Sequence, residues 1–180
     1  TRIYRKAYGL FASNGIMFNH ESPERGENFI SKKTTKAVAE ISLGLRDTLY
    51  IGNLNSFRDW GYAGDYVEAM WRIMQYKKPD DFVIATNKTH SVRKFIELAF
   101  KRVGISIIWK GKGVTEIGFD KKSKKIRVKV DKIYFRPNEV EYLKGDYTKI
   151  KKLIGWKPKM KFEQLVNIMV DADLKELKNK

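Results

Sequence analysis

The sequence predicts an α/β fold, and two features of the chain indicate it. Segments of strand character alternate with segments of helical periodicity along most of the 180 residues, an alternation that is typical of α/β proteins. The apolar share of 42% is sufficient for a domain with a real hydrophobic core. No internal repeat and no low-complexity linker divides the chain, so we expect one structural unit over residues 1–180.

The first half of the chain predicts two strands and a helix between them. Gly9 to Phe18 is expected to be a strand that ends at a polar cluster, and Asp81 to Thr86, DFVIAT, is a short apolar run that suits a buried strand. An extended segment, LYIGNLN, comes before Arg58, and Asp59 to Gly61 are expected to form the turn into a helix. That helix carries an apolar stripe at helical spacing, made of Tyr66, Val67, Met70, Trp71 and Met74.

The second half predicts three helices and a β-hairpin. The first helix begins at about Ser91 and Gly104 ends it, and a second, short helix is opened by Asp146 and closed by Gly155. A last helix begins at about Phe162 and is apolar along one face. The hairpin precedes the last two helices, because apolar Ile126, Val128 and Val130 alternate with Arg127, Lys129 and Asp131 after a lysine-rich turn.

The charge is strongly positive. There are 37 lysines and arginines against 21 aspartates and glutamates, a formal net charge of +16, and such a field attracts polyanions. The densest run is the expected hairpin turn with Lys121, Lys122, Lys124 and Lys125, where solvation is the simplest interpretation. No RNA-recognition motif, zinc-finger pair or basic zipper accompanies it, so a nucleic-acid partner is not favoured, although a polyanion-binding protein stays an alternative.

Several classes of site and location are not indicated by the sequence. The chain has no cysteine and two histidines, and no carboxylate cluster has ligand spacing, so we expect no metal site. No run of about 18 apolar residues predicts a membrane-spanning helix. The basic N-terminus is interrupted by Ser13 and Asn14 and makes a poor signal-peptide core. A cytoplasmic protein is the default expectation.

A glycine-rich turn for a dinucleotide is also not found. In α/β nucleotide enzymes such a turn follows the first strand and lets backbone N–H groups approach a pyrophosphate. The nearest glycine spacing, Gly111 and Gly113, lies between lysines in WKGKG and does not join a strand to a helix. The chain is therefore not a dinucleotide enzyme, or the half that holds the glycine-rich turn is missing from it.

Two polar clusters stand out as candidate sites. The stretch NHESPERG, Asn19 to Gly26, follows the first expected strand, and parallel strands place ligands at their carboxyl ends. In FRPNEV, Pro137 is expected to fix a turn that projects Arg136 and Glu139 close together. The alternative for this second cluster is an exposed ion pair three residues apart, which contributes little to stability.

Five separated blocks of the chain closely resemble the C-terminal part of the GDP-mannose 4,6-dehydratases, a family of the extended short-chain dehydrogenase/reductase superfamily. They are NGIMFNHESPERGENFISKK, RDWGYAGDYVEAMW, ATNKTHSVRKFIE, FRPNEVEYLKGD and LIGWKPKMKFEQLVNIMVDAD. The resemblance implies the last strands and helices of a Rossmann-like sheet, interleaved with a small α/β lobe that binds the sugar nucleotide. It implies a lyase that converts GDP-mannose to GDP-4-keto-6-deoxy-mannose and water with tightly bound NADP, on the route to GDP-fucose. A homodimer or homotetramer is the implied assembly.

The resemblance also implies roles for individual residues. Asn19, Lys33, Arg58, Arg136 and Glu139 match positions that bind the substrate, and His20 and Arg25 match positions that contact NADP. The chemistry is suitable, because guanidinium and ammonium groups pair with phosphate and a carboxylate accepts hydrogen bonds from ribose hydroxyls. Glu24 departs from the family pattern, since many relatives carry an arginine there, and this puts the arginine-lined cofactor contacts between subunits in doubt.

No catalytic residue is expected in this chain. In the family, the glycine-rich cofactor loop and the Tyr-x-x-x-Lys pair lie upstream of the position where Thr1 aligns. We therefore expect the chain to supply the GDP-sugar-binding part of the enzyme and to be inactive alone. The alternative is a non-catalytic binding fragment, either for a GDP-sugar or for nucleic acid and other polyanions.

Some of these residues have simpler structural interpretations. Taken without the resemblance, Lys32 and Lys33 form a solvated helix face, and His90 is a cap or turn residue before a helix. Glu21 and Ser22 cap the turn into Pro23. For Trp60 we expect packing in the core rather than stacking on a base.

Overall fold

The computed structural model describes residues 1–136 and 138–179. Six α-helices lie in this part of the chain: α1 (Arg2–Tyr8), α2 (Ile30–Ser42), α3 (Ala63–Met74), α4 (Val92–Arg102), α5 (Thr148–Ile154) and α6 (Phe162–Lys178). The first strands are β1 (Gly15–Met17), β2 (Asn19–Glu21), β3 (Leu49–Ile51), β4 (Phe57–Arg58) and β5 (Trp60–Tyr62). The others are β6 (Phe82–Ile84), β7 (His90–Ser91), β8 (Ile107–Lys110), β9 (Ile117–Asp120) and β10 (Ile126–Val130). A 3₁₀ turn, η1 (Gly113–Thr115), lies between β8 and β9.

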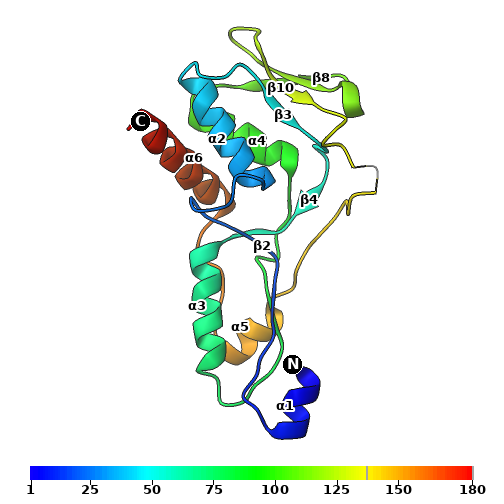
Figure 1. Cartoon of the computed structure of the whole chain (residues 1–180), viewed down its shortest axis with the longest axis vertical. Helices are drawn as coiled ribbons and strands as arrows, with labels where there is room; N and C mark the ends of the chain where they lie inside the picture. The colour runs from blue at the N-terminus through cyan, green and yellow to red at the C-terminus, as the bar shows by residue number, and fades with distance from the viewer. Residues whose placement is uncertain (137, 180) are drawn as a thin grey trace.

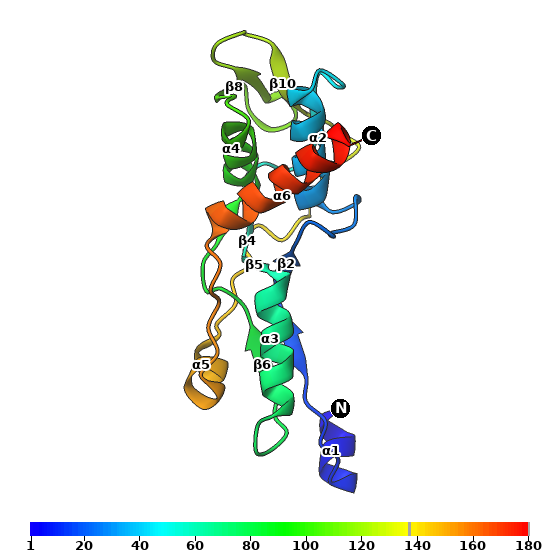
Figure 2. The ribbon, with the colours of Figure 1, turned by 90° about the vertical axis from the view of Figure 1, so that its left-hand side faces the viewer.

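The molecule is elongated, with a narrow middle and an element group at each end (Figure 1, Figure 2). One end holds α2, α4 and α6 and the four-stranded sheet β3-β10-β9-β8, in which β10 is parallel to β3 and antiparallel to β9. The other end holds α1, α3, α5 and the parallel pair β1-β6. Another parallel pair, β2-β5, and the antiparallel pair β4-β7 lie at the narrow middle. Short parallel strands packed with helices confirm the predicted α/β class.

Each end has its own hydrophobic core. The larger core joins apolar residues of α2, α4 and α6 to the inner face of the four-stranded sheet, including Val38, Phe95, Val128 and Val166, which are all fully or almost fully buried. The smaller core packs Tyr66 and Ile73 of α3 against Phe82 of β6 and against Trp156, beyond the end of α5. Because the two cores are separate, the contacts at the narrow middle decide how the two ends are held together.

The long strand expected over Gly9 to Phe18 is wrong in its extent. Regular pairing begins only at Gly15 and lasts three residues, because the partner strand β6 has three residues. Before it, Arg5 and Asn14 both donate hydrogen bonds to the carboxylate of Asp81, so the preceding segment is tied down by side chains rather than by a ladder. The polar cluster is itself a strand, since Asn19–Glu21 forms β2.

The turn expected at Asp59 to Gly61 is also wrong. Trp60–Tyr62 forms β5, which pairs in parallel with β2, and the helix begins only at Ala63. The expected core position of Trp60 is confirmed, because it is 2% exposed. Its ring stacks on Phe162 with centroids 5.6 Å apart.

Helix α3 is confirmed, but its predicted apolar stripe mostly faces outward. Val67 and Trp71 are 60% and 64% exposed, whereas Tyr66, Ala69 and Ile73 are buried. Gly61 leaves the room that the Tyr66 ring fills, since a Cβ at Gly61 would lie 2.3 Å from the ring. The buried face is therefore set by the fit of Tyr66 against β5, which the periodicity of the helix does not reveal.

The helix ends and the hairpin follow the sequence signals closely. The Ser91 hydroxyl accepts a hydrogen bond from the Lys94 amide at the start of α4, while Gly104 and Gly155 take left-handed φ values of 77° and 73° at the ends of α4 and α5. Strands β9 and β10 form the expected hairpin. The interpretation of His90 as a cap or turn residue is wrong: it lies in β7 and stacks on Phe162 with centroids 3.9 Å apart.

No helix in the described part of the chain combines the length and the apolar character that crossing a membrane requires.

Asp59 joins the segments that meet at the narrow middle. Its carboxylate is fully buried and accepts hydrogen bonds from the Thr86 amide and hydroxyl, the Asn87 amide and the Gly145 amide. These donors lie in the loops after β6 and before α5, and Asp59 itself separates β4 from β5. One buried carboxylate therefore holds together three parts of the chain that are far apart in sequence.

We expect Asp59→Asn to lower the free energy of unfolding by about 2–3 kcal/mol, because an amide has one acceptor oxygen and leaves buried N–H groups unpaired. Urea denaturation followed by circular dichroism measures the change. The matched control is Asp47→Asn at an exposed aspartate, for which we expect a change within about 0.5 kcal/mol. Equal effects of the two substitutions would contradict the role of Asp59.

Candidate functional site

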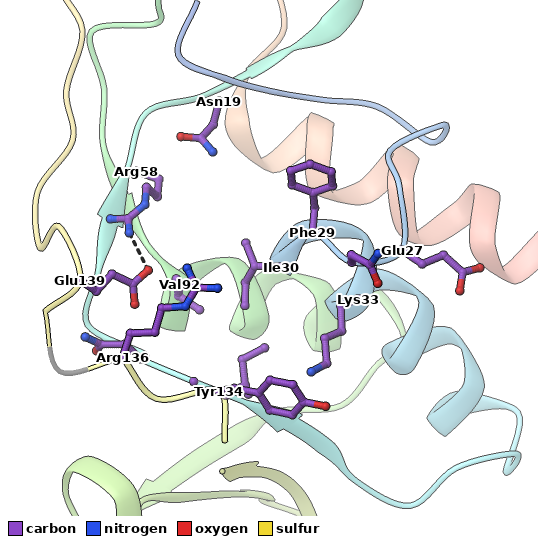
Figure 3. A pocket seen from close by; sticks show the side chains of 14 residues that line it. Asn19, Glu27, Phe29, Ile30, Lys33, Arg58, Val92, Tyr134, Arg136 and Glu139 are labelled. Carbon is purple, nitrogen blue, oxygen red and sulfur yellow. Dashed lines mark hydrogen bonds and ion pairs between the residues drawn. The ribbon is translucent and has the colours of Figure 1, made fainter. Parts of the chain in front are cut away.

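A cavity of about 670 Å³ opens beside the first turn of α2, between the end of β3 and the segment that follows β10 (Figure 3). Its lining combines an apolar part with amide and charged side chains. The lining residues are Asn19, Glu27, Asn28, Phe29, Ile30, Lys33, Ile51, Gly52, Asn53, Arg58, Val92, Tyr134, Arg136 and Glu139. This size and mixture suit a small polar ligand rather than a lipid or a metal ion.

All five residues that the sequence analysis assigns to substrate binding line this one cavity. Asn19 comes from β2, Lys33 from α2 and Arg58 from β4, and Arg136 and Glu139 come from the segment after β10. These positions are as far as 120 residues apart in the chain (139 − 19). The fold therefore gathers them at one place, while the role of each remains a prediction.

Arg58 and Glu139 form an ion pair across the cavity wall, which Figure 3 shows as a dashed line. The Arg58 Nη2 atom donates to Glu139 Oε1 at 2.7 Å, and Nη1 donates to the carbonyl of Val140 at 2.6 Å. The sequence left open an ion pair between Arg136 and Glu139; in the described chain the cation that meets Glu139 is Arg58 instead. The turn predicted at Pro137 lies outside the described residues.

Two cations of the cavity have no carboxylate partner among the described residues. Lys33 places its Nζ atom 3.3 Å from the centroid of the Tyr134 ring, a cation–π contact. Arg136 extends its guanidinium group into the cavity toward Ile30 and Val92 (Figure 3). The nearby carboxylates are already engaged, since Glu27 pairs with Lys36 at 2.5 Å and Glu139 with Arg58. The cavity is therefore electropositive, and it attracts an anion.

Gly52 allows the cavity wall to form. A Cβ there would lie 2.1 Å from the carbonyl oxygen of Tyr134, so only glycine permits the segment after β10 to pack this close to the end of β3. The sequence analysis missed both Gly52 and Tyr134. Neither belongs to a polar cluster, and their importance depends on a contact between segments about 80 residues apart.

A second hollow, of about 340 Å³, adjoins the first. It is lined by Met17, Phe18, Asn19, His20, Arg25 and Leu143, so it contains both positions assigned to the cofactor. Asn19 lines both hollows. His20 Nδ1 lies 2.9 Å from the carbonyl oxygen of Phe18. A carbonyl only accepts, so Nδ1 carries the proton in this contact and Nε2 is left to meet a ligand.

Arg25 is held by two neighbours. Its guanidinium carbon lies 3.5 Å from the centroid of the Phe29 ring, and Nε lies 3.2 Å from Glu21 Oε2. The expected cap at Ser22 is confirmed, because its hydroxyl accepts from the Glu24 amide. The same expectation is wrong for Glu21, whose buried carboxylate accepts from the Ser31 hydroxyl. Burial raises the pKa of Glu21, although Ser31 and Arg25 act in the opposite direction.

Lys32 is the clearest departure from the simple interpretation of the sequence. A solvated helix face is wrong for this residue, which is 8% exposed and forms an ion pair with Asp173 of α6 at 2.5 Å. Lys33, the next residue, reaches the cavity instead. In the described residues we find no group of three or more histidine, aspartate or glutamate side chains placed to hold a metal ion.

Comparison with known sequences identifies relatives over almost the whole chain. The family profile described as GDP-mannose 4,6 dehydratase matches residues 1–169. GDP-mannose 4,6 dehydratase 1 of Arabidopsis thaliana is 52% identical over 171 residues, which are 95% of this chain and 43% of the relative. GDP-mannose 4,6 dehydratase of Homo sapiens is also 52% identical, with 95% and 46% covered. The chain thus spans about half the length of the curated relatives it matches.

Comparison with solved structures gives the same fold. RMD from Pseudomonas aeruginosa, complexed with NADPH, superposes with a TM-score of 0.80 at 16% identity, over 97% of this chain and 52% of that chain. The dTDP-glucose 4,6-dehydratase of Bacillus anthracis, in complex with NAD, has a TM-score of 0.73 at 18% identity, over 98% and 49%. These likenesses confirm the predicted Rossmann-like fold of the extended short-chain dehydrogenases/reductases. The division into interleaved lobes stays a prediction.

The raised pKa of Glu21 predicts a specific dependence of stability on pH. The folded protein keeps this proton at pH values where the unfolded chain has lost it, so ionisation disfavours folding. From about pH 4 to about pH 7, the wild type should lose stability relative to Glu21→Gln, with a constant difference above the folded pKa. Urea titrations of both proteins at several pH values measure this. A wild type that gains on the variant as the pH rises would contradict it.

Proposed function

The chain belongs to the GDP-mannose 4,6-dehydratase family, and from this we propose that it supplies the GDP-sugar-binding part of such a dehydratase. The proposed reaction converts GDP-mannose to GDP-4-keto-6-deoxy-mannose and water. We assign to this chain the binding and orientation of the substrate, and we assign no catalytic acid, base or nucleophile to it.

The observation that carries the proposal is the gathering of Asn19, Lys33, Arg58, Arg136 and Glu139 around one electropositive cavity. A nucleoside diphosphate sugar presents a diphosphate, two ribose hydroxyls and sugar hydroxyls. Cations without fixed counter-ions, a carboxylate and an amide are the groups that bind these parts.

Each side chain suits one part of this ligand. We infer that Arg136 and Lys33 bind the diphosphate, since neither meets a carboxylate in the described chain, and Lys33 can leave the Tyr134 ring to do so. Glu139 gives only Oε1 to Arg58, so Oε2 is left to accept hydrogen bonds from ribose hydroxyls. The Asn19 amide both donates and accepts, which suits a hydroxyl or a phosphate oxygen.

For the neighbouring hollow we propose a nicotinamide cofactor, and specifically NADP, in contact with His20 and Arg25. The fit is partial: Arg25 offers a cation, but Glu21 and Phe29 already contact it, so it would bind a phosphate only as one member of a larger set. A bound nicotinamide would supply hydride transfer. His20 offers a ring nitrogen, and Asn19 places the cofactor and substrate regions side by side.

Assembly and location are part of the same proposal. A homodimer or homotetramer is what the family resemblance implies, and a cytoplasmic location remains a prediction from composition. Glu24 is exposed at the turn after β2, so its charge is free to act on a neighbouring subunit.

Binding of polyanions is the second candidate function. The observation that favours it is the hairpin turn, where Lys121, Lys122, Lys124 and Lys125 are all exposed. Such binding is not selective among polyanions and weakens steeply as salt increases.

Calorimetric titration with GDP-mannose at physiological salt, with and without excess DNA, separates the two candidates. Saturable binding that survives the competitor supports the GDP-sugar site. Binding to DNA alone, with a steep salt dependence, supports the polyanion function and contradicts the proposal.

Arg136→Ala should weaken GDP-mannose binding about tenfold or more, because a charge-assisted hydrogen bond to the diphosphate is lost. The matched control is Arg46→Ala, an arginine whose side chain is 45% exposed and that pairs only with Glu40, for which we expect the wild-type dissociation constant. Calorimetry measures both. Unchanged affinity in the Arg136 variant would remove the diphosphate from this place in the cavity.

A further inference from the structure

The buried ion pair between Lys32 and Asp173 lies outside both hollows, and the proposed function gives it no role. It joins α2 to α6 across 141 residues of chain, with an Nζ to Oδ1 distance of 2.5 Å. The two side chains are 10% and 3% exposed. Asp173 Oδ2 is buried as well and receives no hydrogen bond from the described residues.

Stability alone does not account for this pair. Taking two charges out of water costs about as much as, or more than, their attraction returns, so well-packed apolar side chains at such positions are often equally stable or better. An unpartnered carboxylate oxygen adds to the cost. The geometry around Lys32 indicates what the charges provide instead.

The same ammonium group holds the loop that follows β2. Lys32 Nζ donates to the carbonyl oxygen of Pro23 at 2.7 Å. The loop over residues 22–29 is built of two successive turns, closed by the Arg25 amide on Ser22 and the Phe29 amide on Gly26. An ammonium group has three donor hydrogens, so it can bind the carbonyl and Asp173 together.

The first turn of α2 therefore controls both hollows. Ser31 donates to Glu21, which contacts Arg25 of the second hollow. Lys32 holds Pro23 and is itself held by Asp173. Lys33 projects into the first cavity. Three consecutive residues thus join the loop, the last helix and the cavity.

We propose that Lys32 and Asp173 are positioning residues: the pair fixes the 22–29 loop against α2, so that Arg25 and Lys33 stay in register for their two ligands. The ligands named here rest on the proposed function, whereas the fixing of the loop does not. Asp173 acts through Lys32, and neither residue touches a ligand.

The test replaces the pair without breaking it in half. A single loss of either partner would strand a buried charge and risk unfolding the chain, so the variant is the double substitution Lys32→Met with Asp173→Leu. This variant keeps the packing between α2 and α6 and removes the donor to Pro23. The matched control is Arg102→Met with Asp171→Leu, an exposed ion pair that ends two residues away on the same helix α6.

Hydrogen exchange without ligand is the first readout. In the double variant, the amides of Arg25 and Phe29 should exchange about tenfold faster, while those inside α2 and α6 keep their protection. The affinities for GDP-mannose and NADP⁺ should each fall about tenfold. Lys32→Arg, which keeps the charge and the donors, should restore the slow exchange. The control pair should match the wild type throughout.

A folded double variant with wild-type exchange in the loop would overturn the proposal, and so would an equal effect of the control pair. If the wild type binds neither nucleotide, the proposed function fails while the exchange data still decide the positioning role. If exchange accelerates but both affinities are unchanged, the pair fixes the loop for a purpose other than these ligands, and the link to Arg25 and Lys33 is wrong.

Discussion

The buried carboxylate of Asp59 is the constraint on which the rest of the structure depends. The strands at the narrow middle of the molecule have two or three residues each, too few for backbone pairing to hold the two ends in one arrangement. Asp59 accepts hydrogen bonds from Thr86, Asn87 and Gly145. Gly145 fits there only without a side chain, since a Cβ would lie 2.3 Å from that of Ala85. Arg58 and Trp60, on either side of Asp59, thereby enter the cavity and the core.

The positive charge of the chain is organised at the cavity rather than simply concentrated there. Arg58 is neutralised by Glu139 and serves as part of the wall, whereas Lys33 and Arg136 meet no carboxylate in the described residues. The difference between the two kinds of cation is one of partners and not of residue type. Because an unpaired cation beside an apolar surface gains most from meeting an anion, the arrangement favours one small anionic ligand over a broad polyanion.

The sequence allowed much of the fold to be predicted. Helix ends were predicted well because Ser91, Gly104 and Gly155 act locally, through hydrogen bonds and backbone conformations within a few residues. Strand limits and helix orientation were not. The Gly9 to Phe18 strand was too long because its length is set by β6, and α3 buries Tyr66 rather than Trp71 because of the space at Gly61.

The sequence by itself determined the family, the α/β class and the residue types of the candidate site, because motifs such as NHESPERG and FRPNEV carry those residues at fixed spacing. Only the tertiary structure decided which charges are spent on holding the protein together. Lys32 and Lys33 are neighbours of the same type, yet one is buried against Asp173 and the other faces the cavity. Successive side chains of a helix point about 100° apart, so their environments are set by the elements packed on each side, and these come from distant parts of the chain.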